Sequence, residues 1–207
     1  MNEETLKPLV EAILLAADQP MSIDAIRHLV ESLDNPVSRS DLSRVLDALA
    51  ADCETRGVEL ARVASGYRYQ VKRDYAPIVM KLWEEKPKKY SRALLETLAL
   101  IAYRQPVTRA EIEDVRGVSV SSSIIKTLLD RQWVQVIGHR DTPGKPALYA
   151  TTRQFLDYFG LRSLDELPSL KELQDLDAIN PVLDLGEQGV DSEPRGSTGG
   201  ESGVVTH

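Results

Sequence analysis

The sequence predicts a mainly helical α+β protein in which two domains of one design follow each other and are followed by a disordered acidic tail. Three observations predict this fold class. A block of sequence recurs, since Pro106 and Pro20 occupy matching places in two similar runs (106 − 20 = 86). Each copy shows three helical stripes and then a strand-type alternation. The last part of the chain is polar and rich in glycine.

The repeat covers the end of one helix and the start of the next. The run Leu14–Ser22 matches Leu100–Thr108, with leucine, alanine, glutamine and proline identical at corresponding places. In the first copy, residues 6–17 carry apolar side chains at helical spacing, and Pro20 cannot continue that helix. Because the same order of patterns follows in each copy, we interpret the match as structural.

The rest of the first copy predicts two further helices and a hairpin. Ser22 and Ser38 are expected N-caps, because a serine hydroxyl at that position accepts a hydrogen bond from a free backbone N–H group. Apolar residues between positions 42 and 49 mark the third helix. Residues 67–72 alternate between apolar and polar, which predicts a strand that pairs with residues 58–63.

The second copy repeats this order. Residues 94–103 form an apolar helical stripe, and Thr108 with Glu111 predicts a capping box at the start of the next helix. Residues 124–129 mark a third helix, and a hairpin with a long tip is expected over residues 134–150. Three helices followed by a two-stranded hairpin is the winged-helix arrangement, so we expect two tandem winged-helix domains. The alternative is a generic α+β domain duplicated for stability.

Composition divides the chain into an N-terminal domain with a linking helix (1–87), a C-terminal domain (88–170) and an acidic disordered tail (171–207). The linking helix is predicted from the amphipathic spacing of residues 75–83. A short helix after the second hairpin is expected to end at Gly160. The last residues, 186–207, hold six glycines and almost no apolar side chains, so burial cannot offset the entropy cost of ordering them.

Charge and cysteine usage narrow the function classes. The net charge is −7. Residues 1–87 hold 11 basic and 15 acidic residues (−4), and residues 88–170 hold 12 basic and 9 acidic residues (+3). Residues 171–207 hold 2 basic and 8 acidic residues (−6). The mildly basic middle predicts that nucleic acid is contacted weakly or indirectly. Cys53 is the only cysteine, which excludes a disulfide framework. The chain shows no signal peptide and no apolar run near the ~18 residues of a membrane span, so we expect a soluble, cytoplasmic protein without a membrane partner.

The sequence contains no pattern that predicts catalysis, a metal or a cofactor. His28, His139 and His207 lack metal-ligand spacing, and Cys53 has no histidine near it in the sequence. Residues 138–146 resemble a phosphate-binding loop only superficially, because five residues separate the glycines and a proline replaces the required hydroxyl. We therefore expect a protein that is not an enzyme.

The first helix of each copy is more apolar than a small domain needs. From Leu9 to Ala17 only Glu11 is charged, and from Leu94 to Tyr103 only Glu96 is charged. Such a helix is expected to bury a second face against another chain. The alternative is that the third helix and the hairpin of the same domain cover both faces.

The third helices are poor candidates for reading DNA. In the first copy, Arg39 and Arg44 lie among acidic residues that phosphate would repel. The second hairpin is better supplied with charge, and Arg140 and Lys145 are the candidate DNA contacts. A winged-helix DNA-binding transcription regulator is therefore the alternative function, and it predicts duplex binding with a steep salt dependence.

Several motifs of the second copy resemble one known family. They are Arg116–Val118, Ile124–Leu129, Gly138–Arg140, Pro143–Pro146, Tyr149–Thr152 and Phe155–Leu161. Together they resemble the segregation and condensation protein B family, and the first copy matches more loosely through Glu11–Leu14 and Ser65–Arg68. The resemblance covers about residues 6–170 and leaves out the tail. One departure is Lys145, where the family often has arginine.

The resemblance implies a non-enzymatic subunit of a condensin-like SMC–kleisin complex, which acts in chromosome condensation and partition during cell division. It implies a homodimer, formed through the N-terminal domain, that binds the kleisin and through it the SMC ATPase in the nucleoid. We hypothesise that the dimer interface consists of Leu9, Val10, Ile13, Leu14 and Ala17. The kleisin is expected on the C-terminal domain, at Leu95, Leu98 and Tyr103.

Overall fold

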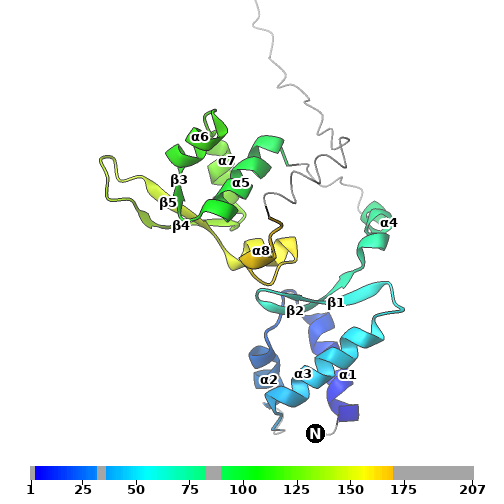
Figure 1. The fold of residues 1–207 in the computed structure, drawn as a ribbon. Helices are drawn as coiled ribbons and strands as arrows, with labels where there is room; N and C mark the ends of the chain where they lie inside the picture. Colours follow the sequence, from blue (N-terminus) through cyan, green and yellow to red (C-terminus); the bar gives the residue numbers. More distant parts are fainter. Residues whose placement is uncertain (1–2, 32–35, 83–89, 170–207) are drawn as a thin grey trace, which may run out of the picture.

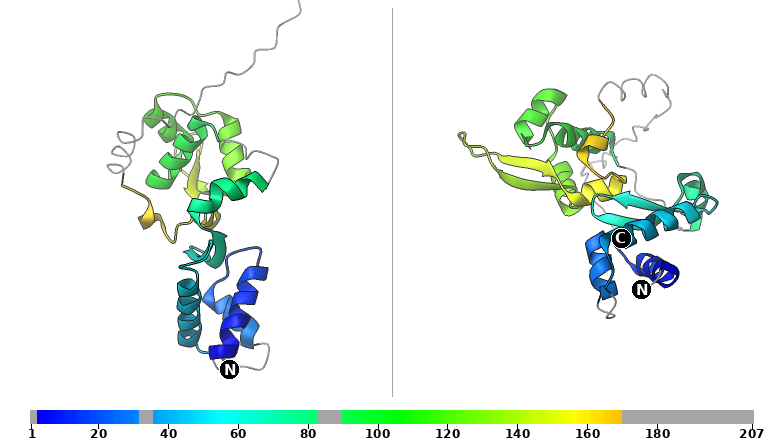
Figure 2. Two further views of the ribbon diagram at one scale, coloured as in Figure 1. Left: turned by 90° about the vertical axis from the view of Figure 1, so that its right-hand side faces the viewer. Right: turned by 60° about the horizontal axis from the view of Figure 1, so that its bottom comes forward.

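The computed structural model describes residues 3–31, 36–82 and 90–169. They form a mainly helical α+β fold of two helix–strand units that resemble tandem winged helices, as predicted (Figures 1 and 2). The buried apolar residues form one cluster in each unit. The predicted tail over residues 171–207 lies outside the described residues, as does the end of the predicted linking helix.

The first unit begins with three helices, which are α1 (Glu3–Ala16), α2 (Ile23–Glu31) and α3 (Arg39–Asp52). Both predicted serine caps are present. The Ser22 hydroxyl accepts from the N–H of Ala25 at 3.1 Å, and the Ser38 hydroxyl accepts from the N–H of Asp41 at 3.1 Å. These caps satisfy backbone donors that a helix leaves free at its first turn. Helix α3 ends at Cys53, whose side chain is buried.

The predicted hairpin follows as the antiparallel strands β1 (Val58–Val63) and β2 (Gly66–Val71). Val63 pairs with Gly66, so Ala64 and Ser65 form the turn. Gly66 has φ +147°, and a Cβ atom there would lie 2.1 Å from the carbonyl oxygen of Met21. Met21 and Tyr67 exchange two backbone hydrogen bonds of 2.8 and 2.9 Å. The hairpin is therefore fixed to the segment that precedes α2.

The second unit repeats this order with one addition. Its elements are α5 (Arg92–Arg104), β3 (Val107–Thr108), α6 (Arg109–Arg116), α7 (Ser122–Asp130), β4 (Val134–His139) and β5 (Ala147–Thr151). The sheet order is β3-β5-β4, so the wing has three strands instead of the expected two. Val107 in β3 pairs with Tyr149, just as Met21, its counterpart in the repeat (107 − 21 = 86), bridges to Tyr67.

The predicted capping box and the predicted glycine helix ends are present. Thr108 accepts from the N–H of Glu111, and the Glu111 carboxylate accepts from the N–H of Thr108. Gly117 ends α6 with φ 69°, and Gly160 ends α8 (Arg153–Phe159) with φ 71°. A left-handed residue at a helix end favours glycine because it has no Cβ atom.

The linking helix is irregular, and its described part covers residues 73–82. It consists of the 3₁₀ turns η1 (Arg73–Tyr75) and η2 (Met80–Leu82) around the four-residue helix α4 (Ala76–Val79). Ile78 is 68% exposed and Leu82 is 78% exposed. In the part of the chain that the structure describes, these apolar side chains are not packed against other residues over most of their surface. Tertiary packing therefore does little to stabilise a regular α-helix at this place.

Contacts between aromatic rings pack α8 against the rest of the second unit. Trp133 is buried, and its ring centroid lies 5.2 Å from that of Tyr90, 4.5 Å from that of Tyr158 and 5.4 Å from that of Phe159. The 3₁₀ turn η3 (Leu164–Glu166) follows. Helix α8 also lies beside the β1–β2 hairpin, so α8 and the chain just after it meet the first unit (Figure 1).

Candidate protein-binding surfaces

The second unit carries an apolar groove of about 330 Å³ between α5 and α8. Helix α5 forms one wall, α8 forms the other, and the chain after α8 completes it. The lining residues are Leu95, Leu98, Ala99, Ala102, Tyr103, Phe155, Phe159, Leu161, Leu167 and Pro168. The structure therefore brings together Leu95, Leu98 and Tyr103, the three residues expected to bind a kleisin.

The α5 wall of the groove contains both buried core residues and exposed residues at its edge. Leu98 is buried and also belongs to the hydrophobic core, whereas Ala99 is exposed. The hydroxyl of Tyr103 donates to the carbonyl oxygen of Pro168, which ties α5 to the segment after α8. The groove is thus a preformed feature of the folded unit.

The α8 wall was not predicted from the sequence. Phe155 and Phe159 are four residues apart, so they lie on one face of the helix and both line the groove. The signal was present in the block Phe155–Leu161, which carried the family resemblance. Its apolar spacing alone could not show that this face lies opposite α5.

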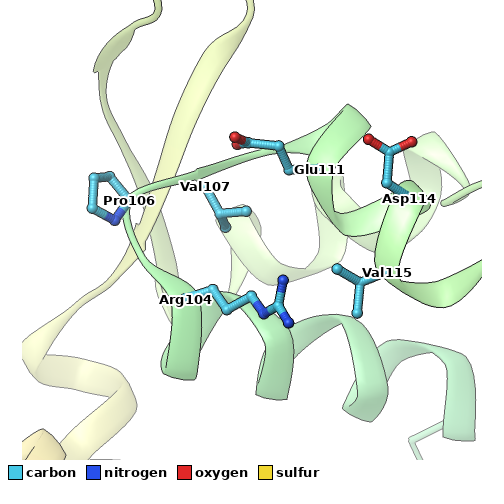
Figure 3. Close-up of a pocket in the computed structure, with 6 residues that line it drawn as sticks. All are labelled: Arg104, Pro106, Val107, Glu111, Asp114 and Val115. Atoms are coloured by element: carbon cyan, nitrogen blue, oxygen red, sulfur yellow. The ribbon is translucent and has the colours of Figure 1, made fainter.

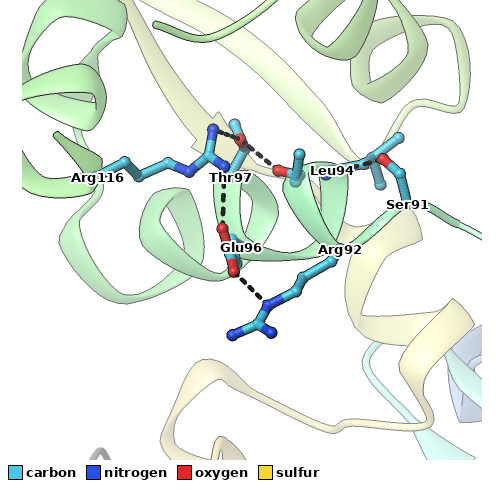
Figure 4. A network of polar contacts seen from close by, with 7 residues as sticks. Ser91, Arg92, Leu94, Glu96, Thr97 and Arg116 are labelled. Atoms are coloured by element: carbon cyan, nitrogen blue, oxygen red, sulfur yellow. Dashed lines mark hydrogen bonds and ion pairs between the residues drawn. The ribbon is translucent and has the colours of Figure 1, made fainter. Parts of the chain in front are cut away.

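A polar network fixes α5 to α6. The Glu96 carboxylate accepts from Arg92 Nε at 2.8 Å and from Arg116 Nη2 at 2.9 Å, and Arg116 Nη1 reaches Thr97 Oγ1 at 3.5 Å (Figure 4). The hydrogen bonds from Arg92 and then Arg116 lower the pKa of Glu96. Since Arg116 lies on α6, this network sets the position of the helix that forms one groove wall.

A second cavity of about 260 Å³, lined in part by charged side chains, lies where β3 leads into α6 (Figure 3). Its lining residues are Arg104, Pro106, Val107, Glu111, Asp114 and Val115. Glu111 is already engaged by the N–H of Thr108 and by Arg140, and these contacts lower its pKa. The lining includes no cysteine, serine or histidine side chain among the described residues.

The five residues predicted for the dimer interface do not share one surface. Val10 and Leu14 lie in the core of the first unit at 0% and 3% exposure. Leu9, Ile13 and Ala17 are half-buried. The outward face of α1 is instead formed by Ala12, Leu15 and Ala16, with Leu15 65% exposed. The residues from Leu9 to Ala17 are apolar apart from Glu11, so their pattern does not show which face of the helix packs against the core.

Most of the arginines considered for DNA contact are paired with acids. Arg39 Nη1 lies 3.3 Å from Asp24, and Arg44 pairs with Asp41. In the second wing, Arg140 Nη1 lies 2.8 Å from Glu111, and Lys145 lies at the exposed tip beside it. These ion pairs are exposed, and DNA contact through Arg140 and Lys145 stays a prediction.

Within residues 3–31, 36–82 and 90–169, no cluster of three or more histidine, cysteine, aspartate or glutamate side chains could hold a metal ion. No helix in that part of the chain combines the length and apolar character needed to cross a membrane.

Comparison with known proteins identifies relatives over most of the chain. The family model for segregation and condensation complex subunit ScpB matches residues 8–170. A segregation and condensation protein B homolog of Coxiella burnetii is 53% identical over 188 residues, which is 91% of this chain and 88% of that protein. Segregation and condensation protein B of Bacillus subtilis is 40% identical over 180 residues, or 86% of this chain and 89% of that protein.

Two solved structures are also similar. The crystal structure of ScpB from Mycobacterium tuberculosis is 35% identical, covers 78% of this chain and 98% of that chain, and superposes with a TM-score of 0.37. The crystal structure of a dimer of the ScpB N-terminal domain complexed with a ScpA peptide is 31% identical. It covers 39% of this chain and 96% of that chain, with a TM-score of 0.33.

Two units of this design, with an apolar groove on the second, define a tandem winged-helix protein. The chain belongs to the ScpB family, as its motifs indicated. It is a non-enzymatic subunit of the SMC segregation and condensation complex, so the expected absence of enzymatic activity is confirmed by the family. Family membership also decides between this function and the alternative of a transcription regulator.

Proposed function

We propose that the chain acts as a homodimer and binds the kleisin ScpA in the groove between α5 and α8, and through ScpA the SMC ATPase. Residues 1–87 would serve dimerisation, and residues 88–170 would bind the partner. The groove carries the proposal, because three predicted contact residues line it together. The protein would work in the cytoplasm at the nucleoid, with DNA contacted weakly or indirectly. The solved structure with a ScpA peptide holds a dimer of the ScpB N-terminal domain, so it supports dimerisation and ScpA as a partner and does not bear on the groove of the second unit.

The chemistry of the groove suits an apolar peptide segment. Its one hydroxyl, on Tyr103, is already bonded to Pro168. The volume of about 330 Å³ is at the small end for ligand sites, which hold about 300–1,000 Å³. A few large side chains of an amphipathic helix or an extended segment fit this space. Each fully buried aliphatic or aromatic side chain contributes about 1.5–3 kcal/mol before the cost of association.

A charge at the rim of the groove tests the kleisin site. Ala99 is exposed and lines the groove, so Ala99→Glu places a carboxylate against any apolar partner without entering the core. The control is Ala110→Glu, because Ala110 is exposed on the neighbouring helix α6. Calorimetry of the full chain with purified ScpA should show at least a tenfold loss of affinity for Ala99→Glu only. Equal affinities for both variants would refute the site.

The dimer contact is proposed on the outward face of α1. Leu15 is its largest exposed side chain, flanked by Ala12 and Ala16. Small side chains let two helices approach closely across a two-fold axis, where the same face meets its own copy. Of the predicted set, the half-buried Leu9 and Ile13 lie between this face and the core, Val10 and Leu14 lie in the core, and Ala17 follows the end of α1.

Light scattering tests this contact. The chain has a mass of 23.0 kDa, so a dimer has 2 × 23.0 = 46.0 kDa. Leu15→Glu should reduce the measured mass to that of one chain, because it places two carboxylates at the two-fold axis. Leu29→Glu is the control, since Leu29 is 45% exposed on α2. A dimer that persists in Leu15→Glu would reject the α1 face.

A further inference from the structure

The two units meet at a polar joint between the first hairpin and α8. The N–H of Ser65 donates to Asp157 Oδ1 at 2.9 Å, and the Ser65 hydroxyl donates to Asp157 Oδ2 at 2.6 Å. The N–H of Ala64 donates to the carbonyl oxygen of Leu161 at 2.9 Å. Asp157 is only 6% exposed. Both oxygens of one buried carboxylate thus bind a single residue of the other unit, and α8 lies next to the hairpin in Figure 1.

Both sides of the joint are held firmly within their own units. On the hairpin side, the backbone of Gly66 lies against Met21, and Met21 is hydrogen-bonded to Tyr67. On the helix side, Thr152 caps α8, and the N–H of Leu161 donates to the carbonyl oxygen of Leu156 at 2.8 Å. The joint therefore connects the β1–β2 hairpin to α8, and each of these is fixed within its own unit. The geometry of the joint thus sets how the hairpin and α8 lie relative to each other.

The joint and the groove share one helix. Asp157 lies two residues from both Phe155 and Phe159, and two residues turn an α-helix by about 200°. The carboxylate therefore lies on the face of α8 opposite the two phenylalanines that line the groove. Leu161 takes part in both, since its carbonyl oxygen accepts from Ala64 and its side chain lines the groove.

We propose that Asp157 is a positioning residue, which holds the α8 wall of the groove in place by binding Ser65 of the first unit. The first unit thereby sets the affinity of the second unit for its partner. This inference rests on the proposed binding of ScpA in the groove. If the Asp157 carboxylate lost its hydrogen-bond donors while buried, its burial would be destabilising. The joint therefore has two states, one in which Asp157 binds Ser65 and one in which the contact is open to water.

A double-mutant cycle tests the inference in the full chain. Ser65 is in the first unit and does not line the groove, so a loss of affinity in Ser65→Ala cannot come from damage to the groove lining. We expect Ser65→Ala and Asp157→Asn each to weaken ScpA binding about tenfold, within the usual range for coupled sites. The double variant should lose no more affinity for ScpA than the single variant that binds ScpA more weakly, because both substitutions break the contact between Ser65 and Asp157. Asp165→Asn, an exposed carboxylate after α8, should bind like the wild type.

Hydrogen exchange without ScpA separates the two possible failures. Asp157→Asn should speed amide exchange at Ala64 and Ser65 and in residues 155–161, and leave α2 and α3 unchanged. Wild-type affinity in Ser65→Ala, or unchanged exchange in Asp157→Asn, would overturn the joint while the groove stands. Loss of binding in Ala99→Glu, together with tenfold losses in both joint variants, would support both proposals. Unaltered binding in Ala99→Glu would instead refute the groove, and with it the role of Asp157.

Discussion

Replacing Phe159 by alanine tests how much of the groove's affinity comes from apolar burial. Phe159 lines the groove and is 42% exposed, which is the surface that a bound partner can still cover. For an aromatic side chain of roughly 200 Å², this fraction is about 85 Å². At about 25 cal/mol per Å², burial contributes about 2 kcal/mol. We therefore expect Phe159→Ala to weaken ScpA binding about 30-fold.

Tyr158→Ala is the matched control for this measurement. Tyr158 is 50% exposed and its ring lies 4.5 Å from that of Trp133, as Phe159 lies 5.4 Å from it, but Tyr158 does not line the groove. Calorimetric titration with ScpA should give an affinity within about threefold of the wild type for Tyr158→Ala. Wild-type affinity in Phe159→Ala, or an equal loss in both variants, would show that the magnitude does not come from the groove.

Three further predictions concern stability. Gly66→Ala should lower the free energy of unfolding by about 3 kcal/mol in a urea titration, because its Cβ would lie 2.1 Å from the Met21 carbonyl oxygen; an unchanged midpoint would contradict the geometry. Thr108→Ala should cost about 1 kcal/mol in thermal unfolding, since it removes the N-cap of α6, and Ser119→Ala, at an exposed serine outside the helices, should cost less. Acid should destabilise the second unit, because hydrogen bonds lower the pKa of Glu96 and Glu111 below 4.5, the ordinary value. As the pH falls, the unfolded chain therefore binds protons before the folded chain does. The stability that these carboxylates contribute above pH 4.5 is lost as the pH falls through their folded-state pKa values. Glu96→Gln should make the urea midpoint of unfolding depend less on pH, which urea titrations at several pH values measure.

Local signals were enough to predict most of the helices and both hairpins. Ser22, Ser38 and Thr108 cap helices where they were expected to, because a cap depends on residues within one turn. Gly160 ends α8 for the same reason. The three residues predicted for the kleisin site lie together in one groove, since they share a helix face. Whether ScpA binds there stays a prediction.

The features that were missed depend on distant parts of the chain. Strand β3 has two residues and exists because Val107 pairs with Tyr149, so no period-2 pattern marks it. The second half of α1 is apolar on nearly all sides, and its packing on α3 and β2 shows that Val10 and Leu14 face inward. The contact between Ser65 and Asp157 joins residues 92 positions apart, and neither residue type is unusual in its own segment.

The single thiol and a buried indole give each half of the molecule its own reporter. Cys53 is 2% exposed in the first core, so a maleimide reagent should modify it only when that core opens. Trp133 is 2% exposed in the second core, and its fluorescence can be isolated by replacing Trp83 with phenylalanine. Alkylation kinetics and emission recorded on one sample would thus show whether the two halves melt together or in turn.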